Sequence, residues 1–171
     1  MRISILHNRD HHLLDDDPGR EAREDVVRVA AALEKALAGK RRQVSLIGVD
    51  RDVWAIGKAL EAQRPDVVVN LCESLAADSR GEMVVPALLE MVGIPYTGNS
   101  ALALGLSLHK DKAKQLLLAS AVPTPQFAVV TSVAELLSVT LPFPLIVKPS
   151  REDASVGIDF DAVVHDKPSL G

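Results

Sequence analysis

The chain has 171 residues, of which 47% are hydrophobic, 25% charged and 3% aromatic, and its formal net charge is −4. This length suits one ordinary domain, or a small domain with part of another, and the composition is that of a globular protein. A mildly acidic chain lacks the basic surface of nucleic-acid-binding proteins, and a single cysteine excludes a disulfide framework and a cysteine-based zinc site. Neither a signal-peptide pattern nor an uninterrupted membrane span is found, so we expect a cytoplasmic protein.

The first hundred residues alternate between strand-like and helix-like patterns. Short apolar runs predict strands, and apolar residues spaced three or four apart predict amphipathic helices. The expected elements, in chain order, are a strand at 2–6, a helix at 20–37, a strand at 43–49, a helix at 51–63, a strand at 66–71 and a helix within 76–93. This order predicts an α/β fold with a doubly wound parallel sheet of about four strands, in which 66–71 is a central strand.

The pattern changes near residue 98, where we expect a domain boundary between 1–98 and 99–171. A helix at 110–121 carries Lys110 and Lys114 one turn apart on one face. The remaining elements expected in this second part are strands at 127–130, 144–148 and 158–160 and a short helix at 133–138. We expect this last third to be mobile or to pair with another copy of the chain.

The segment at 144–159, PLIVKPSREDASVGID, is the most informative for chemistry. An apolar strand ends in Lys148, and a small polar loop follows. An ammonium beside flexible backbone N–H groups suits a nucleotide polyphosphate. An ordinary hairpin with a solvated lysine is the alternative, and spacing alone favours it. The chain has no Walker-type or G-x-G-x-x-G motif, so a nucleotide site would be of another kind.

Four segments together resemble the ATP-grasp superfamily, and within it the D-alanine–D-alanine ligase group. They are the opening strand followed by DPGREAREDV, then NLCES, then PALLEMVGIPYTGNSALALGLSLHKDKAKQLLLASAVPTP, and finally PLIVKPSREDASVGI. The third segment is the most specific of the four. The resemblance implies a pre-ATP-grasp, Rossmann-like substrate domain at 1–98, followed by an incomplete α+β part of the ATP-grasp nucleotide-binding domain at 99–171.

The resemblance also implies a reaction. Such ligases use ATP and Mg²⁺ to phosphorylate the carboxylate of one amino acid, and the amine of a second amino acid then attacks, as in peptidoglycan synthesis. In this chain Lys110 would contact the ATP phosphates, Lys148 would reach the adenine and phosphate side, and the loop 150–157 would close over the phosphates. Within this loop, the resemblance implies that Glu152, Ser155 and Gly157 bind ATP. It also implies that Ser155 is a catalytic residue.

Two glutamates are candidates for the amino-acid site. The resemblance matches either Glu21 or Glu24 to the first-helix glutamate that holds the ammonium of the first substrate. Glu73, like Glu82, lies where a substrate could bind beyond the end of the third strand. Helix capping and ion pairing explain Glu73 and Glu82 about as well.

The chain departs from the family pattern at three places. Asp153 and Ala154 stand where a glycine and a serine are usual, His109 replaces an aspartate, and Cys72-Glu73 replace a His-Gly pair. These differences favour a ligase-like protein whose substrate is another amino acid or a peptide.

The later family features have no match after Gly157: the adenine-hinge segment, the acidic metal ligands and the phosphate-stabilising arginine. We therefore expect the amino-terminal half of a ligase, with the Mg²⁺ ligands in the missing half and no metal ligand in this one. We expect this half to be inactive alone, because in-line transfer needs the metal.

Two other hypotheses remain open. The first is a non-catalytic module that binds a small molecule or a nucleotide, or that forms a homodimer. The second is a flavodoxin-like regulatory domain, which leaves the 144–149 segment unexplained. Two smaller features have simple explanations: His11 and His12 suit a solvated loop better than a metal site, and Cys72 suits a small buried residue better than a nucleophile.

Overall fold

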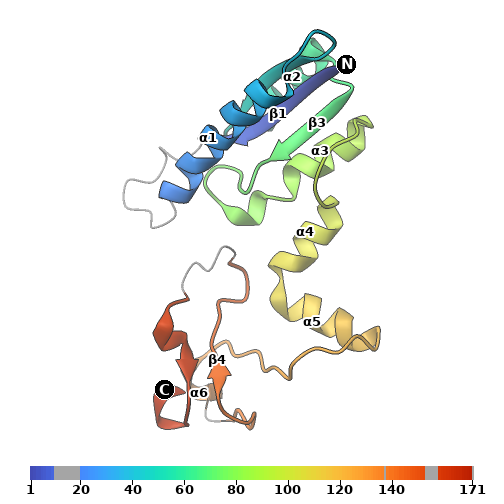
Figure 1. Ribbon diagram of the computed structural model, residues 1–171. Helices are drawn as coiled ribbons and strands as arrows, with labels where there is room; N and C mark the ends of the chain where they lie inside the picture. The colour runs from blue at the N-terminus through green and yellow to red at the C-terminus, as the bar shows by residue number, and fades with distance from the viewer. Residues whose placement is uncertain (10–19, 137, 153–157, 171) are drawn as a thin grey trace. The chain divides into compact units, whose positions relative to one another are not determined.

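The computed structural model describes residues 1–9, 20–136, 138–152 and 158–170 (Figure 1). The side chains of residues 20–24 are outside this description. The chain divides into two compact units, Met1–Gly105 and Leu106–Gly171. The predicted boundary at residue 98 between a substrate domain and a nucleotide-binding domain stays a prediction.

The first unit is built on a parallel sheet of three strands in the order β2-β1-β3. These strands are β1 (Arg2–Asn8), β2 (Gln43–Val49) and β3 (Val67–Leu71). Helix α1 (Arg20–Leu37) follows β1, α2 (Val53–Gln63) follows β2, and α3 (Val84–Val92) comes after β3. The predicted mixture of helices with a parallel sheet is confirmed, whereas the doubly wound arrangement stays a prediction.

The centre of the three-stranded sheet is β1, where residues 3–8 are all buried. Strand β3 has β1 on one side and a short segment around Tyr96 on the other. The Val68 N–H donates to the Pro95 carbonyl at 2.8 Å, and the Thr97 N–H donates to the Val68 carbonyl at 3.0 Å. This single parallel bridge takes the place of the fourth strand, so β3 has a hydrogen-bonded neighbour on each side.

The main core lies between the sheet and helices α2 and α3. Its buried members are Leu6, Ile47, Val49, Ile56, Leu60, Val68, Cys72, Val85 and Leu89. Two valines of α1 and α3, Val29 and Val92, are each 48% exposed, although the apolar residues of an amphipathic helix are expected to be buried. Val92 is the last residue of α3, just before Gly93 ends the helix in a left-handed conformation, and Val29 lines a pocket instead.

The second unit has less regular structure. Helix α4 (Ala101–Leu108) runs from the first unit into it, and α5 (Lys110–Ala119) and α6 (Val133–Leu136) follow. Strands β4 (Leu145–Ile146) and β5 (Val163–Val164) form an antiparallel pair, with Leu145 opposite Val164. The predicted strand at 144–148 is thus present but shorter.

The predicted strands at 127–130 and 158–160 are wrong. Residues 127–130 have no strand partner in the described part of the chain, and a strand requires one. Near the second position the chain makes a 3₁₀ turn at Phe160–Ala162, because the Asp159 side chain accepts the Asp161 N–H at 2.9 Å. No helix in the described ranges is both long and apolar enough for a membrane span.

Candidate functional site

The carboxyl ends of β1 and β3 meet at one edge of the sheet, and Asn8 connects them. Its side chain is 1% exposed. The Asn8 Oδ1 accepts the Glu73 N–H at 2.7 Å, and the Asn8 Nδ2 donates to the Ser74 carbonyl at 2.8 Å. One amide therefore satisfies two backbone groups of the loop after β3, and it fixes the position of the Glu73 backbone.

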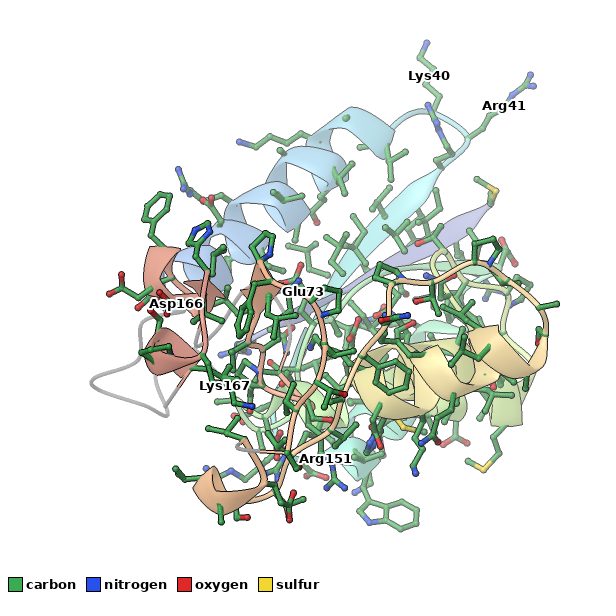
Figure 2. The ribbon with its side chains drawn as sticks, turned by 90° about the horizontal axis from the view of Figure 1, so that it is seen from below. Lys40, Arg41, Glu73, Arg151, Asp166 and Lys167 are labelled. Carbon is green, nitrogen blue, oxygen red and sulfur yellow. The ribbon has the colours of Figure 1, made fainter. Side chains whose placement is uncertain are left out.

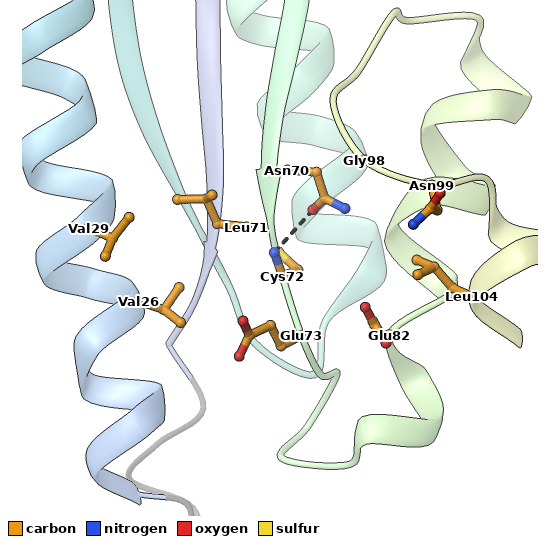
Figure 3. A pocket seen from close by; sticks show the side chains of 10 residues that line it. All are labelled: Val26, Val29, Asn70, Leu71, Cys72, Glu73, Glu82, Gly98, Asn99 and Leu104. Carbon is orange, nitrogen blue, oxygen red and sulfur yellow. Dashed lines mark hydrogen bonds between the residues drawn. The ribbon is translucent and has the colours of Figure 1, made fainter. Parts of the chain in front are cut away.

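The beginning of the same loop is held by Asn70. Its side-chain Oδ1 accepts the Cys72 N–H at 3.2 Å, as the dashed line in Figure 3 shows. Its backbone N–H donates to the Thr97 Oγ1 at 3.1 Å. Cys72 is 4% exposed and belongs to the main core cluster. The interpretation of Cys72 as a small buried residue is therefore confirmed.

A pocket of about 330 Å³ opens beside this loop (Figure 3). Aliphatic side chains from α1 and α4 form part of its wall, and amide and carboxylate groups form another part. The lining residues are Val26, Val29, Asn70, Leu71, Cys72, Glu73, Glu82, Gly98, Asn99 and Leu104. The position beyond the carboxyl ends of parallel strands is where α/β proteins bind small molecules.

A carboxylate on α3 anchors the segment that carries Asn99 and Leu104. The Tyr96 hydroxyl donates to Glu90 Oε1 at 2.6 Å, and the Ala101 N–H donates to the same oxygen at 2.9 Å. The bond from Tyr96 lowers the pKa of Glu90 below its ordinary value, with help from the Ala101 bond. The same bond to Glu90, together with burial, raises the pKa of Tyr96 to about 12. Glu90 thus ties the start of α4 to α3.

In the second unit, the start of α5 lies against the loop after β4. The Lys110 N–H donates to the Ser150 carbonyl at 3.1 Å, and the Lys110 ammonium donates to the Glu152 carbonyl. The Ser150 hydroxyl donates to Asp111 Oδ1 at 3.4 Å. Two of the predicted ATP-binding residues, Lys110 and Glu152, are therefore in contact.

The two other lysines of interest have different surroundings. Lys148 lies just before this loop and is exposed. The Lys114 ammonium donates to the Thr124 Oγ1 at 2.8 Å and lies 5.1 Å from the centre of the Phe127 ring. Lys114 thus holds the proline-containing segment after α5 by a hydrogen bond and a cation–π contact.

Several predicted site residues lie outside the described part of the chain. These are Ser155, Gly157, His11 and His12, together with the side chains of Glu21 and Glu24 on α1. Their roles stay predictions. In the described ranges, no three histidine, cysteine, aspartate or glutamate side chains lie close enough together to hold a metal ion.

The sequence did not reveal the role of Asn8 or the wall formed by Asn99 and Leu104. The only signal for Asn8 was its place at the end of a buried strand, since polar residues there often bind loops or ligands. Arg80, which lies between Glu73 and Glu82 in the sequence, has its guanidinium bound to Asp78, with an N···O distance of 2.7 Å. That bond to Arg80 lowers the pKa of Asp78.

Most of the chain is similar in sequence to curated proteins of one enzyme family. The chain is 34% identical over 128 residues to a D-alanine–D-alanine ligase of Beijerinckia indica, covering 75% of this chain and 40% of that protein. It is 34% identical over 136 residues to the D-alanine–D-alanine ligase of Methylocella silvestris, covering 80% of this chain and 42% of the relative. It is also 40% identical over 109 residues to y4sG, an uncharacterized protein of Sinorhizobium fredii, covering 64% and 31% of the two chains.

Solved structures agree on the fold. A D-alanine–D-alanine ligase from Bacillus anthracis, complexed with ATP, matches 99% of this chain and 52% of its own, with a TM-score of 0.66 and 21% identity. The ligase from Helicobacter pylori gives a TM-score of 0.65 at 18% identity over 99% of this chain and 60% of its own. No family model matches the sequence. The chain spans less than half the length of the curated relatives that it matches.

Proposed function

We propose, from the premise that this chain is a partial D-alanine–D-alanine ligase-like protein of the ATP-grasp superfamily, that it supplies the amino-terminal half of an ATP-dependent carboxylate–amine ligase. In this proposal residues 1–98 form the substrate domain, and residues 99–171 form the first part of the nucleotide-binding domain. The substrates are amino acids, and the enzyme works in the cytoplasm.

The observation that carries the proposal is the contact between α5 and the loop after β4. The Lys110 ammonium and the backbone of residues 150–152 come together in the second unit. A cation beside a small polar loop suits the phosphates of ATP, because the ammonium supplies charge and the loop supplies hydrogen-bond donors. The exposed Lys148 adds a second positive charge shortly before that loop.

The chain's own residues would bind and orient the reactants. Lys110 and Lys148 would hold the phosphates, and Ser155 and Gly157 would cover them. Either Glu21 or Glu24, together with Glu73, would hold the ammonium groups of the amino acids. When bound, ATP supplies a phosphoryl group that turns a carboxylate into a reactive acyl donor.

Mg²⁺ would accompany the bound ATP, and the described residues offer no group of three acidic, histidine or cysteine side chains that could hold it. More than half the length of the curated relatives lies outside the matched region. We therefore propose that the 171-residue chain binds nucleotide but makes no product alone.

Isothermal titration calorimetry of the chain with ATP tests the nucleotide site. Lys110→Met removes the ammonium and should weaken ATP binding about tenfold, the loss expected for one charge-assisted bond. Lys112→Met is the matched control, because Lys112 is an exposed lysine on the same helix, paired only with Asp111 at 3.6 Å among the contacts described. Its ATP affinity should stay within about twofold of the parent.

Equal effects of the two substitutions would contradict a site at Lys110. Absence of ATP binding by the parent chain would favour the alternative of a module that binds another small molecule or that dimerises. ATP-dependent formation of a dipeptide by the pure chain would contradict the inactivity that we propose.

A further inference from the structure

A second pocket of the first unit lies at the end of the sheet where the strands begin. It has a volume of about 530 Å³ and is lined by α2, the residues that follow α2, the end of α3 and Arg2 of β1. In Figure 2, Lys40 and Arg41, in the turn before β2, mark this end of the sheet, and Glu73 marks the end where the first pocket opens. Because the strands are parallel, the two pockets lie at opposite ends of the sheet.

Gly57, in the middle of α2, has no packing reason in the described part of the chain. Apart from its neighbours along the helix, a Cβ built on this glycine meets no atom within 4 Å. A glycine inside a helix costs stability relative to alanine, and it usually has a packing or functional reason. Because Gly57 lines the second pocket, its missing side chain keeps that space open.

Arg64, which follows α2, departs from helix preferences in the opposite way. Its φ is 45°, in the left-handed region where glycine is favoured and a residue with a side chain is strained. Its side chain also lines the second pocket. A glycine where a side chain is preferred and an arginine where glycine is preferred therefore line one pocket, and such local departures are expected at functional sites.

The charged side chains of the pocket differ in how far they are already paired. Asp66 accepts the Arg2 N–H at 2.6 Å, and its other oxygen lies 3.5 Å from the Arg2 guanidinium. Within the described ranges, no ion pair or side-chain hydrogen bond engages Glu61 or Arg64. One guanidinium and one carboxylate, about a helical turn apart, are thus open to a ligand that carries both an anionic and a cationic group.

The uncharged part of the pocket is aliphatic. Leu60, Val92 and Ile94 contribute to it, and Val92 is 48% exposed there. A ligand with a branched aliphatic group would remove this surface from water, which favours binding. The volume falls within the range of small-molecule sites.

We propose that this second pocket binds an aliphatic amino acid as its zwitterion. Arg64 binds the carboxylate, Glu61 binds the ammonium, and the side chain covers the aliphatic surface. The site goes beyond the proposed function, because it is separate from the ATP site and from the pocket beside Glu73.

Racemic leucine, isocaproate and isoamylamine are matched probes. They share the same branched chain, but isocaproate lacks the ammonium and isoamylamine lacks the carboxylate. Isothermal titration calorimetry measures the binding of each to the full chain. Leucine should bind roughly fivefold more tightly than either of the others, the effect of one partly exposed charge pair.

Two substitutions separate a role in binding from a role in folding. Gly57→Leu fills the pocket and raises helix propensity, and Arg64→Gly removes the guanidinium and the left-handed strain. Both variants should keep or raise the urea midpoint of the parent. Leucine binding should be lost in Gly57→Leu and weakened about fivefold in Arg64→Gly. Lys58→Gln, at an exposed lysine of α2 outside the pocket lining, should leave it within about twofold.

Equal affinity for the three probes, or no binding of leucine, overturns the inference. Leucine binding that survives Gly57→Leu overturns it as well, because leucine would then bind elsewhere, as beside Glu73. A lower urea midpoint in both variants would assign the two residues to folding and would also contradict it. None of these results bears on the nucleotide site, because ATP binding and its dependence on Lys110 are measured separately.

Discussion

Asn8 connects the end of β1 to the loop after β3 in the first unit. It is almost fully buried, and both ends of its amide are used by the loop after β3. A shorter or apolar side chain leaves a backbone N–H and a carbonyl without these partners. An unsatisfied buried polar group costs more than a hydrogen bond gains.

We expect Asn8→Ala to lower the free energy of unfolding by about 2 kcal/mol, since two backbone groups lose their partner. Urea denaturation followed by circular dichroism measures this change. Asn99→Ala, at an exposed asparagine, should change stability by less than about 0.5 kcal/mol. Equal losses in the two variants would show that the amide of Asn8 does not hold the loop.

Tyr96 is the only tyrosine in the chain, so its titration can be read directly from ultraviolet absorbance. The bond to Glu90 favours the neutral phenol, and we expect the tyrosinate signal to appear near the raised pKa of about 12. Glu90→Ala should move the midpoint back toward the ordinary value of 10.0. A native midpoint that Glu90→Ala leaves unchanged would contradict the role of this bond.

The same pair makes stability depend on pH in a defined direction. Because the folded-state pKa of Tyr96 is above its unfolded value, its contribution is complete below pH 10 and is lost as the pH rises toward 12. Glu90 has the opposite sign. Its pKa is lowered by folding, so its contribution is present above about pH 4.5 and is lost as the pH falls through the folded-state pKa.

Helix α2 shows how local and tertiary bonds combine in one element. Its first turn is capped by Asp52, whose Oδ1 accepts the Ala55 N–H at 3.1 Å. At its other end, the Gln63 Oε1 accepts hydroxyl hydrogen bonds from Ser4 at 2.8 Å and Ser45 at 2.5 Å. These serines lie on β1 and β2, so Gln63 connects the helix to the two strands.

We expect Asp52→Ala to destabilise the first unit by about 1 kcal/mol, because the Ala55 N–H loses its capping acceptor. Asp52→Asn keeps an acceptor oxygen, and asparagine is as good an N-cap as aspartate, so this variant should retain most of the stability. Thermal unfolding of the three proteins makes the comparison. An Asn variant as unstable as the Ala variant would mean that the charge of Asp52, not the cap, is what matters.

At the scale of the whole molecule, the two units differ in how much apolar surface they bury. All the buried apolar residues found in the described ranges belong to the first unit, except Leu108 and Val164. Phe160 is 99% exposed, and Leu116 and Leu118 on α5 are 51% and 57% exposed. Burial of apolar area is the main stabilising contribution to folding, so the second unit has much less of it.

We expect the second unit to unfold at lower denaturant concentration than the first. Hydrogen exchange read by mass spectrometry should show faster exchange at residues 106–152 than in β1 and β3. A fragment of residues 1–105 should keep the unfolding midpoint of the more stable transition of the full chain. One transition with uniform protection across both units would contradict this expectation.

The bounds of α1 at 20–37 and of β2 at 43–49 were predicted from the sequence and are confirmed. Both rest on local patterns, since the spacing of apolar residues reports which face of an element is buried. The strand predicted at 127–130 is wrong because a local pattern does not show whether a partner strand is present. Its residues suit an extended chain, but a strand exists only where another segment supplies hydrogen bonds.

The sequence by itself determined the order of helices and strands in the first unit, its parallel sheet and its resemblance to ligases, because these depend on residue pattern along the chain. Only the tertiary structure decided that Asn8 holds the loop at Glu73, that Lys110 contacts Glu152, and that Val29 lines a pocket instead of the core. Each of these joins residues far apart in sequence or depends on which neighbours fold against a side chain. Local periodicity carries no information about such pairings, so the geometry of both candidate sites came from the fold.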